Sequence, residues 1–176
     1  MSNQSSQVAN YLLDKADNEG ESLTSLKLLK ILYICHGWCL ATLGHDILDG
    51  EKVEAWQHGP VIPSVYHEFK RYGPNPITEK AAELTFSGLC DNFSNVSVEK
   101  IYPELKDPKV REVIDYVWST YKQYTGFDLV DMTHEQGTPW SNYFVSGQRY
   151  TEIPNEAIYE YYKKQLSQLI GSAEAV

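Results

Sequence analysis

Positive charge is scarce in this chain, which carries 15 lysine and arginine residues against 24 aspartate and glutamate residues and a formal net charge of −9. A protein that binds along a nucleic-acid backbone needs a surplus of basic side chains to displace counterions. The basic pair Lys70-Arg71 is too short to supply that surplus. We therefore do not expect nucleic acid as a partner, whereas an acidic surface is compatible with a basic protein partner.

Cysteine and long apolar runs are scarce too. The three cysteines, Cys35, Cys39 and Cys90, are odd in number, and in a chain of this length they indicate a reducing compartment rather than a disulfide framework. No positively charged N-terminus precedes an apolar segment, as a signal peptide requires. The longest apolar run lies near residues 31–35 and is far too short to span a bilayer. These absences predict a cytoplasmic protein without a membrane partner.

Motifs of catalysis are missing as well. The sequence has no G-x-S-x-G elbow, no phosphate-binding P-loop and no G-x-G-x-x-G fingerprint. The spacings of His58, His67 and His134 match no zinc pattern, and hydrogen bonds that fix loops are the simpler role for His58 and His134. We expect no catalytic residue, no metal and no cofactor. The alternative of another class is a hydrolase or metal-dependent enzyme that uses His58 and His134.

Apolar and aromatic residues, by contrast, are plentiful: 42% of the 176 residues are hydrophobic and 12% are aromatic. This length and composition predict one compact, mainly α domain over residues 1–176, with flexible tails at about 1–5 and 171–176. Apolar spacing and capping residues predict about six or seven helices and a small β-hairpin element. The helices are expected over about 6–18, 24–44, 65–72, 107–124, 127–134, from 138 onward, and 154–169.

The helix that begins at Thr24 is apolar on nearly every side, which predicts a central buried helix whose narrow solvent stripe is Lys27 and Lys30. The pair Asp49-Gly50 stands between short apolar runs and predicts the β-hairpin over 47–53. Residues 77–105 carry weaker patterns. We expect a helical turn at 79–84 and a polar loop with small strands at 88–98.

The segment from Glu54 to Pro63 is the most informative part of the chain, because it combines a tryptophan, a histidine, a glycine and two prolines. Gly59 permits backbone angles that other residues resist, and Pro60 disfavours the α region at Gly59. Pro63 suits the first turn of a following helix. The segment therefore predicts a rigid corner, and its tryptophan is expected to meet Trp140 in space.

Four groups of residues follow one another along the chain. They are the helix with Thr24, Leu28, Lys30, Leu32 and Tyr33; the run 54–61 with Trp56, His58, Gly59, Pro60 and Val61, followed by Pro63, Val65 and Tyr66; Leu129, Thr133, His134, Pro139 and Trp140; and Ile158, Tyr161 and Tyr162. In their residues and their order these groups resemble the motifs of one known family, the Panacea antitoxin domain family, which includes the SocA-like proteolytic adaptor and phage-associated proteins.

The resemblance implies a mainly α-helical fold, no catalytic site, and a function as an antitoxin that binds and neutralises a cognate toxin. The leading hypothesis is therefore a protein-binding domain that neutralises its toxin by direct contact. A proteolytic adaptor, which would deliver the toxin to a protease as a second partner, is the alternative within the binding class. Such an adaptor needs a second surface for the protease, for which the tail 171–176 could serve, and the same tail could equally be a degradation signal.

Partner-binding residues are expected among the exposed side chains. Tyrosines are concentrated in the C-terminal half, and tyrosine is favoured at interfaces because it buries a large area at a small entropic cost. Tyr159 and Tyr161 are the candidates on the last helix. Asp128 and Asp131, spaced i, i+3, could bind a basic partner or a cation, although a solvated helix face is the simpler interpretation.

Overall fold

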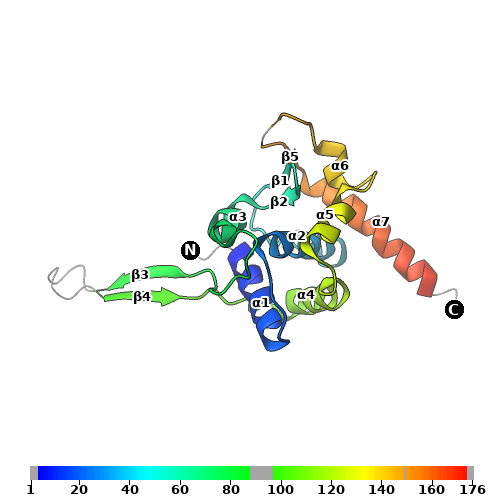
Figure 1. Ribbon diagram of the computed structural model, residues 1–176. Helices are drawn as coiled ribbons and strands as arrows, with labels where there is room; N and C mark the ends of the chain where they lie inside the picture. The colour runs from blue at the N-terminus through cyan, green and yellow to red at the C-terminus, as the bar shows by residue number, and fades with distance from the viewer. Residues whose placement is uncertain (1–3, 88–96, 149, 174–176) are drawn as a thin grey trace.

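The computed structural model describes residues 4–87, 97–148 and 150–173, and over these residues the chain is mainly α-helical, as predicted. The helices and strands are named as in Figure 1. In chain order they are α1 Gln4–Asn18, α2 Ser25–Leu43, β1 Val53–Trp56, β2 Gly59–Val61, α3 Pro63–Phe69 with the 3₁₀ turn η1 Lys70–Tyr72, β3 Glu83–Ser87, β4 Ser97–Ile101, α4 Pro108–Tyr121, α5 Gly126–His134, α6 Pro139–Tyr143, β5 Glu152–Ile153 and α7 Asn155–Ala173.

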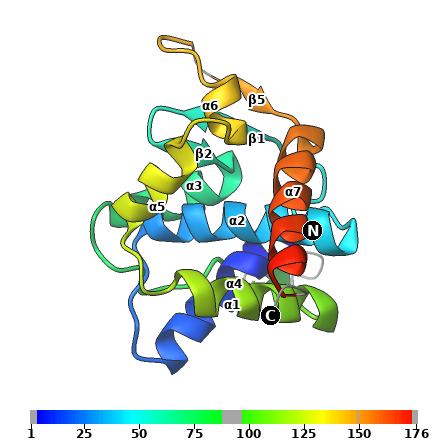
Figure 2. The same ribbon diagram turned by 90° about the vertical axis from the view of Figure 1, so that its right-hand side faces the viewer.

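Helix α2 is the centre of the fold, and the other long helices pack around it (Figure 2). It begins at Thr24, whose side chain accepts a hydrogen bond from the Lys27 N–H, and it ends at Gly44 with φ 63°. The length and composition of α2 alone would allow this helix to cross a membrane, whereas the short apolar run at 31–35 predicted no such helix. However, 78% of the 18-residue stretch of α2 that is apolar enough is buried inside the protein, as is usual for a core helix.

The predicted solvent stripe of α2 is wrong, because Lys27 and Lys30 are both buried. The Nζ of Lys27 donates a hydrogen bond to the Lys122 carbonyl, which follows the C-terminal end of α4. Lys30 is fully buried, and its Nζ donates to the Pro60 carbonyl. A lysine can be buried where its ammonium reaches an acceptor that would otherwise be unpaired, so α2 has no solvent stripe at these positions.

The β-hairpin exists, but it lies later in the chain than predicted. Strands β1 and β2 pair antiparallel with Trp56 opposite Gly59, and β5 pairs with the other edge of β1. Residues 47–50 form a turn and Val53 already belongs to β1, so the predicted hairpin over 47–53 is absent; Ile47 and Leu48 are consecutive and both fully buried, which the alternating faces of a strand do not allow. The Asp46 carboxylate accepts hydrogen bonds from the Leu48 and Gly50 N–H groups and closes this turn.

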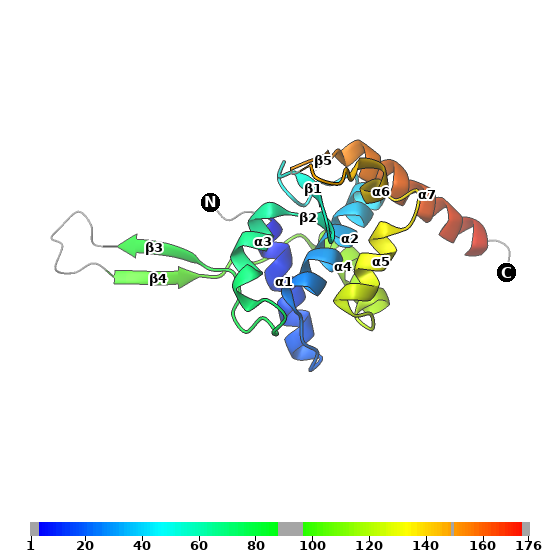
Figure 3. The same cartoon turned by 45° about the horizontal axis from the view of Figure 1, so that its top comes forward.

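A second hairpin, formed by β3 and β4, projects away from the helical body (Figures 1 and 3). The helical turn predicted at 79–84 is absent, since residues 79–82 form no helix and β3 begins at Glu83. The register places Phe86 opposite Val98, with Leu84 two residues away on the same face. All three side chains are more than half exposed. The part of the predicted loop at 88–96, with Cys90, lies outside the described residues.

The helical ends extend into the predicted tails. Helix α1 begins at Gln4, and the buried Ser5 donates a hydrogen bond to the Glu51 carboxylate. Helix α7 continues to Ala173. The predicted tails are therefore shorter than 1–5 and 171–176, and their remaining residues, 1–3 and 174–176, lie outside the described part of the chain.

Candidate functional site

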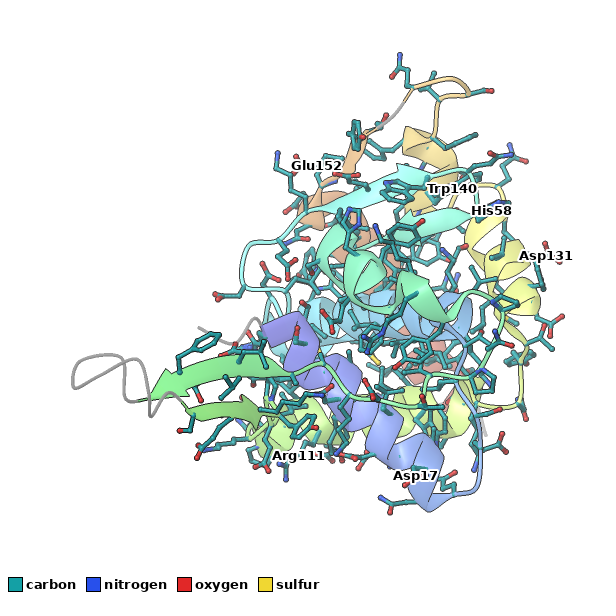
Figure 4. All side chains as sticks on the ribbon, turned by 60° about the vertical axis from the view of Figure 1, so that its left-hand side comes forward. Asp17, His58, Arg111, Asp131, Trp140 and Glu152 are labelled. Carbon is teal, nitrogen blue, oxygen red and sulfur yellow. The ribbon has the colours of Figure 1, made fainter. Side chains whose placement is uncertain are left out.

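The two tryptophans of the predicted corner and of the later motif meet in space, as expected. The indole N–H of Trp140 donates a 2.7 Å hydrogen bond to the Trp56 carbonyl at the end of β1. Trp140 is on α6, whose first turn is capped by Thr138 and starts with Pro139. This bond joins segments that are 84 residues apart, and Figure 4 shows Trp140 and His58 at the same end of the molecule.

Three aromatic rings form a stack beside this bond. The His134 ring lies parallel to the Trp140 indole, with centroids 3.6 Å apart and planes 7° apart. The Phe144 ring is also stacked on the Trp140 indole, with centroids 4.6 Å apart and planes 16° apart. Burial, followed by the positive charge of Lys30, lowers the pKa of His134, although Asp131 opposes this shift. The imidazole is therefore neutral at pH 7, and a neutral ring stacks on an indole without an exposed charge.

The buried side chain of Lys30 contacts the hairpin formed by β1 and β2. Its Nζ lies 2.8 Å from the Pro60 carbonyl oxygen, and burial lowers the pKa of Lys30 to about 7. Gly59 has a φ of 96°, and a Cβ at this residue would lie 2.8 Å from both the Lys30 Nζ and the Thr133 Oγ1. Only glycine combines this backbone angle with this close approach. The glycine of the motif therefore lets β2 lie directly on α2 and α5.

A groove opens where the two motifs meet, with a volume of about 790 Å³. None of its lining residues is acidic, and none is lysine or arginine. They are Ala55, Trp56, Gln57, His134, Trp140, Phe144, Ser146, Gly147, Gln148 and Tyr150. Tyr150 is 70% exposed. We call this the aromatic groove. It offers ring surfaces and amide groups, which suit the binding of an uncharged segment of another molecule.

Several other motif residues have structural positions outside the groove lining. Val61 is buried in β2, and Pro63 is the first residue of α3. Thr133 is buried in α5, and its hydroxyl donates to the Val130 carbonyl, while Thr138 donates to the Thr133 carbonyl. These bonds hold the end of α5 against the start of α6, where the histidine and tryptophan of the stack are found.

The histidines are arranged unlike a metal or nucleophile site. His58 is exposed in the turn between β1 and β2, and His134 is engaged in the ring stack. Within the described ranges, no three His, Cys, Asp or Glu side chains are grouped closely enough to hold a metal ion. The Thr133 hydroxyl, which lies beside Lys30, donates its proton to a helix carbonyl.

The residues predicted to bind a partner lie outside the aromatic groove. Asp128 is exposed and forms a capping box with Thr125, whose hydrogen bonds lower the pKa of Asp128. Asp131 is exposed on α5. Tyr159 and Tyr161 are half-buried on α7, and only Tyr161 lines a cleft, which is a different and smaller one.

Two parts of the site are not predicted by the sequence. The predicted position of Lys30 on a solvent stripe is wrong, although a helix that is apolar on nearly every side indicates that a lysine within it has an internal acceptor. The groove wall formed by Phe144, Gln148 and Tyr150 carries no motif. Its only signal was the i, i+4 spacing of Trp140 and Phe144, which places two rings on one helical face.

Replacing Trp140 by phenylalanine is expected to lower the free energy of unfolding by about 1–2 kcal/mol. The phenyl ring keeps part of the stack with His134, but the Trp56 carbonyl loses its donor. Urea denaturation followed by circular dichroism measures the change. An unaltered midpoint would show that the bond contributes nothing to holding the two motifs together.

The fold and the site together define the class of protein. It is a mainly helical domain with an aromatic groove beside a β-hairpin that packs on a buried lysine. The chain belongs to the family described as "Antitoxin SocA-like, Panacea domain", whose family model matches residues 28–141. The resemblance inferred from the motifs is thereby confirmed. The match includes Lys30, both tryptophans of the site and His134, while Phe144, Tyr150 and α7 lie beyond it.

The chain is also similar to a curated relative, Antitoxin SocA of Caulobacter vibrioides (strain NA1000 / CB15N). The two are 35% identical over 133 residues, which are 76% of this chain and 66% of the relative. This chain therefore covers slightly less than two thirds of that protein's length. No solved structure was found to match.

Proposed function

We propose that this chain is an antitoxin that neutralises a cognate protein toxin by direct contact, and that the aromatic groove takes part in that contact. Membership of an antitoxin family supports the role in general. The position of the groove is the observation that supports its role in binding. Trp56 and Trp140, one from each motif, both line it and are joined by a hydrogen bond. Aromatic residues in a preformed hollow are the usual anchors of a protein interface.

Binding is favoured over hydrolysis by the state of the two histidines. A general base needs a partner that orients it and a nucleophile within hydrogen-bond reach. His134 instead lies flat on Trp140, and burial lowers its pKa. We therefore assign no catalytic residue. We also propose a cytoplasmic location, which the free thiols of Cys35 and Cys39 support.

The test is co-expression with the product of the neighbouring gene. If that product arrests growth alone, the wild-type chain is expected to restore growth and to bind it in pull-down experiments. Replacing Tyr150 by serine is expected to weaken binding at least tenfold, because this ring is 70% exposed in the groove wall. The melting temperature is expected to stay unchanged, since an exposed ring contributes little to folding.

Phe127 provides the matched control for Tyr150. Its ring is 72% exposed and does not line the groove. The variant Phe127→Ser is expected to neutralise the toxin as well as the wild-type chain. If Phe127→Ser lost binding while Tyr150→Ser kept it, the contact would lie on another face, and if neither gene product nor pull-down revealed a toxin, the proposed function would fail.

Delivery of the toxin to a protease is a second candidate that one observation favours. Leu169 and Ile170, near the C-terminal end of α7, are 46% and 52% exposed. An adaptor needs a second surface besides the one that holds its cargo. If these residues form it, Ile170→Ser leaves toxin binding intact and lengthens the cellular half-life of the toxin, measured after translation is stopped.

A further inference from the structure

The β3–β4 hairpin stands clear of the helical body but is fixed to it at its base (Figures 1 and 3). The buried amide of Asn10, on α1, makes this attachment. Its Nδ2 donates hydrogen bonds of 3.0 and 3.1 Å to the Ala81 and Pro103 carbonyls, and its Oδ1 accepts one from the Ala81 N–H. Ala81 precedes β3 and Pro103 follows β4, so one side chain holds both ends of the hairpin in a fixed position.

One face of the hairpin is apolar and uncovered. The register places Phe86 opposite Val98, and Leu84 lies two residues from Phe86 on the same face. These three side chains are 55–56% exposed. Apolar residues at alternate positions are typical of a strand with one covered face, yet among the described elements β3 and β4 pack mainly on each other. The pattern therefore indicates that another molecule covers this face.

The outer edges of the hairpin are open as well. Strands β3 and β4 form a two-stranded sheet, and neither pairs with any other described strand. The outward N–H and C=O groups of an edge strand can pair with an added strand, which is a recurring mode of protein recognition. An added strand continues both faces of the sheet, because side chains alternate between the faces along every strand.

The charges of the hairpin indicate which strand would fit. The face opposite the apolar one carries Glu83 and Glu99, and the only lysine of the two strands, Lys100, is on the apolar face opposite Leu84. Neither glutamate forms an ion pair with a described residue. Opposite charges on neighbouring strands of one face stabilise a sheet. A fitting strand therefore alternates apolar residues with basic ones.

A second copy of this chain fits the hairpin less well. Edge pairing of two hairpins with continuous apolar faces would put the glutamates of both copies on one face, and like charges there destabilise a sheet. Packing of the two apolar faces on each other would bury three half-exposed side chains from each copy, far less than the roughly 800 Å² that each partner buries in a standard interface. Each copy also carries a net charge of −9. Charge thus favours a basic segment of another protein.

We propose that the β3–β4 hairpin binds an extended segment of the toxin, which adds as a third strand and alternates apolar residues with lysine or arginine. This inference rests on the proposed function and names a second contact surface besides the aromatic groove. The main chain of the added strand bonds to a free edge of the hairpin, and its apolar side chains extend the surface around Phe86. Its basic side chains lie beside Glu83 and Glu99.

The first test uses a blocked heptapeptide of alternating valine and lysine as the probe, at pH 7.5 and constant ionic strength. Binding to the full chain is followed by NMR shifts of the hairpin residues. The peptide is expected to bind with a Kd below about 1 mM, at least fivefold more tightly than a valine–glutamate peptide. It is also expected to bind at least threefold more tightly than its fully N-methylated form, which cannot donate main-chain hydrogen bonds. Equal binding in either comparison, or no binding, would overturn the proposal.

Two variants separate the hairpin from the general negative charge of the protein. Phe86→Ser and Glu99→Gln are each expected to bind the valine–lysine peptide at least threefold more weakly and to melt like the wild-type chain, since both residues are exposed. Glu160→Gln is the control, because Glu160 is exposed on α7, on the other side of the body (Figure 1). If Glu160→Gln weakened binding as much as Glu99→Gln, net charge would explain the binding, and the proposal would be overturned.

The competing occupant is tested by analytical ultracentrifugation at pH 7.5 and 10 µM protein, where the wild-type chain is expected to be a monomer. A dimer that Phe86→Ser dissociates would place a second copy on the hairpin and would overturn the proposal.

The two proposals fail in different ways. Phe86→Ser is expected to bind the toxin at least tenfold more weakly than the wild-type chain. If Phe86→Ser neutralises the toxin as well as the wild-type chain does, the hairpin is not part of the contact, and the antitoxin role stands. If the wild-type chain neutralises no toxin, the antitoxin role fails, whereas the peptide measurement still decides whether the hairpin accepts a basic strand.

Discussion

Replacing Gly37 by alanine is expected to lower the free energy of unfolding by about 3 kcal/mol and to detach α7 from α2. Gly37 is in the middle of α2, where the Tyr162 ring lies directly on the backbone. A Cβ at this position would be 2.1 Å from the ring carbon Cε2, so the ring would have to leave its site. Tyr162 and the fully buried Ile158 attach α7 to the core, and both would be displaced.

Gly171 offers the matched control, because it is also helical but a Cβ added there would meet no atom within 4 Å. Gly171→Ala is expected to leave stability unchanged or to raise it by up to about 1 kcal/mol, since alanine favours a helix over glycine. Thermal denaturation compares the two variants. A second variant, Gly37→Ala with Tyr162→Leu, is expected to recover part of the loss, and equal stability of Gly37→Ala and the wild-type chain would contradict the close packing.

The stability of the wild-type chain is expected to rise by about 1–2 kcal/mol between pH 7 and pH 8.5, and Lys30→Met is expected to remove most of this rise. Burial lowers the pKa of Lys30 from its ordinary value of 10.5 to about 7. Between these values the unfolded chain binds more protons than the folded chain, so stability increases with pH. About one pH unit below the folded pKa, the amine is protonated in both states, and its contribution to stability no longer changes.

The rise of stability with pH is expected to end near pH 9, because the titration of two buried thiols then lowers stability as the pH increases. Burial raises the pKa of Cys35, and it raises that of Cys39 to about 12, so the unfolded chain releases these protons first. Urea denaturation at pH 7.0, 7.5, 8.0 and 8.5 measures the slope. Lys106→Met, at an exposed position, is expected to keep the wild-type slope, whereas a flat wild-type profile would contradict a buried amine at Lys30.

The helices could be predicted because their signals are local. Asp107 caps α4 through its side chain, and Thr138 caps α6, as the residue types at these positions indicate. The β-hairpin could not be placed correctly, since Asp49-Gly50 has the composition of a hairpin turn. What decides the structure there is the burial of Ile47 and Leu48 against the core, which is a property of the whole fold.

The site was predictable in part for the same reason. Proline, glycine and tryptophan at 56–63 indicated a rigid corner, and the contact of Trp56 with Trp140 followed from the two motifs. The buried state of Lys30 depends on a carbonyl 30 residues away, which no local pattern reveals. The wall of the groove depends on how the segment after α6 returns to β5, and single residues such as Tyr150 carry no sign of that path.

The hairpin formed by β3 and β4 is expected to promote self-association of the protein at high concentration. Leu84, Phe86 and Val98 expose 55–56% of their surface on one face of two strands whose outer edges pair with no other described strand. Such a surface favours self-association, and mutual repulsion between acidic molecules opposes it. Since the isoelectric point is near 5.0, acidification towards that value removes the repulsion between molecules, and their exposed hairpins then associate. Purification well above this pH, in moderate rather than high salt, keeps the chains dispersed.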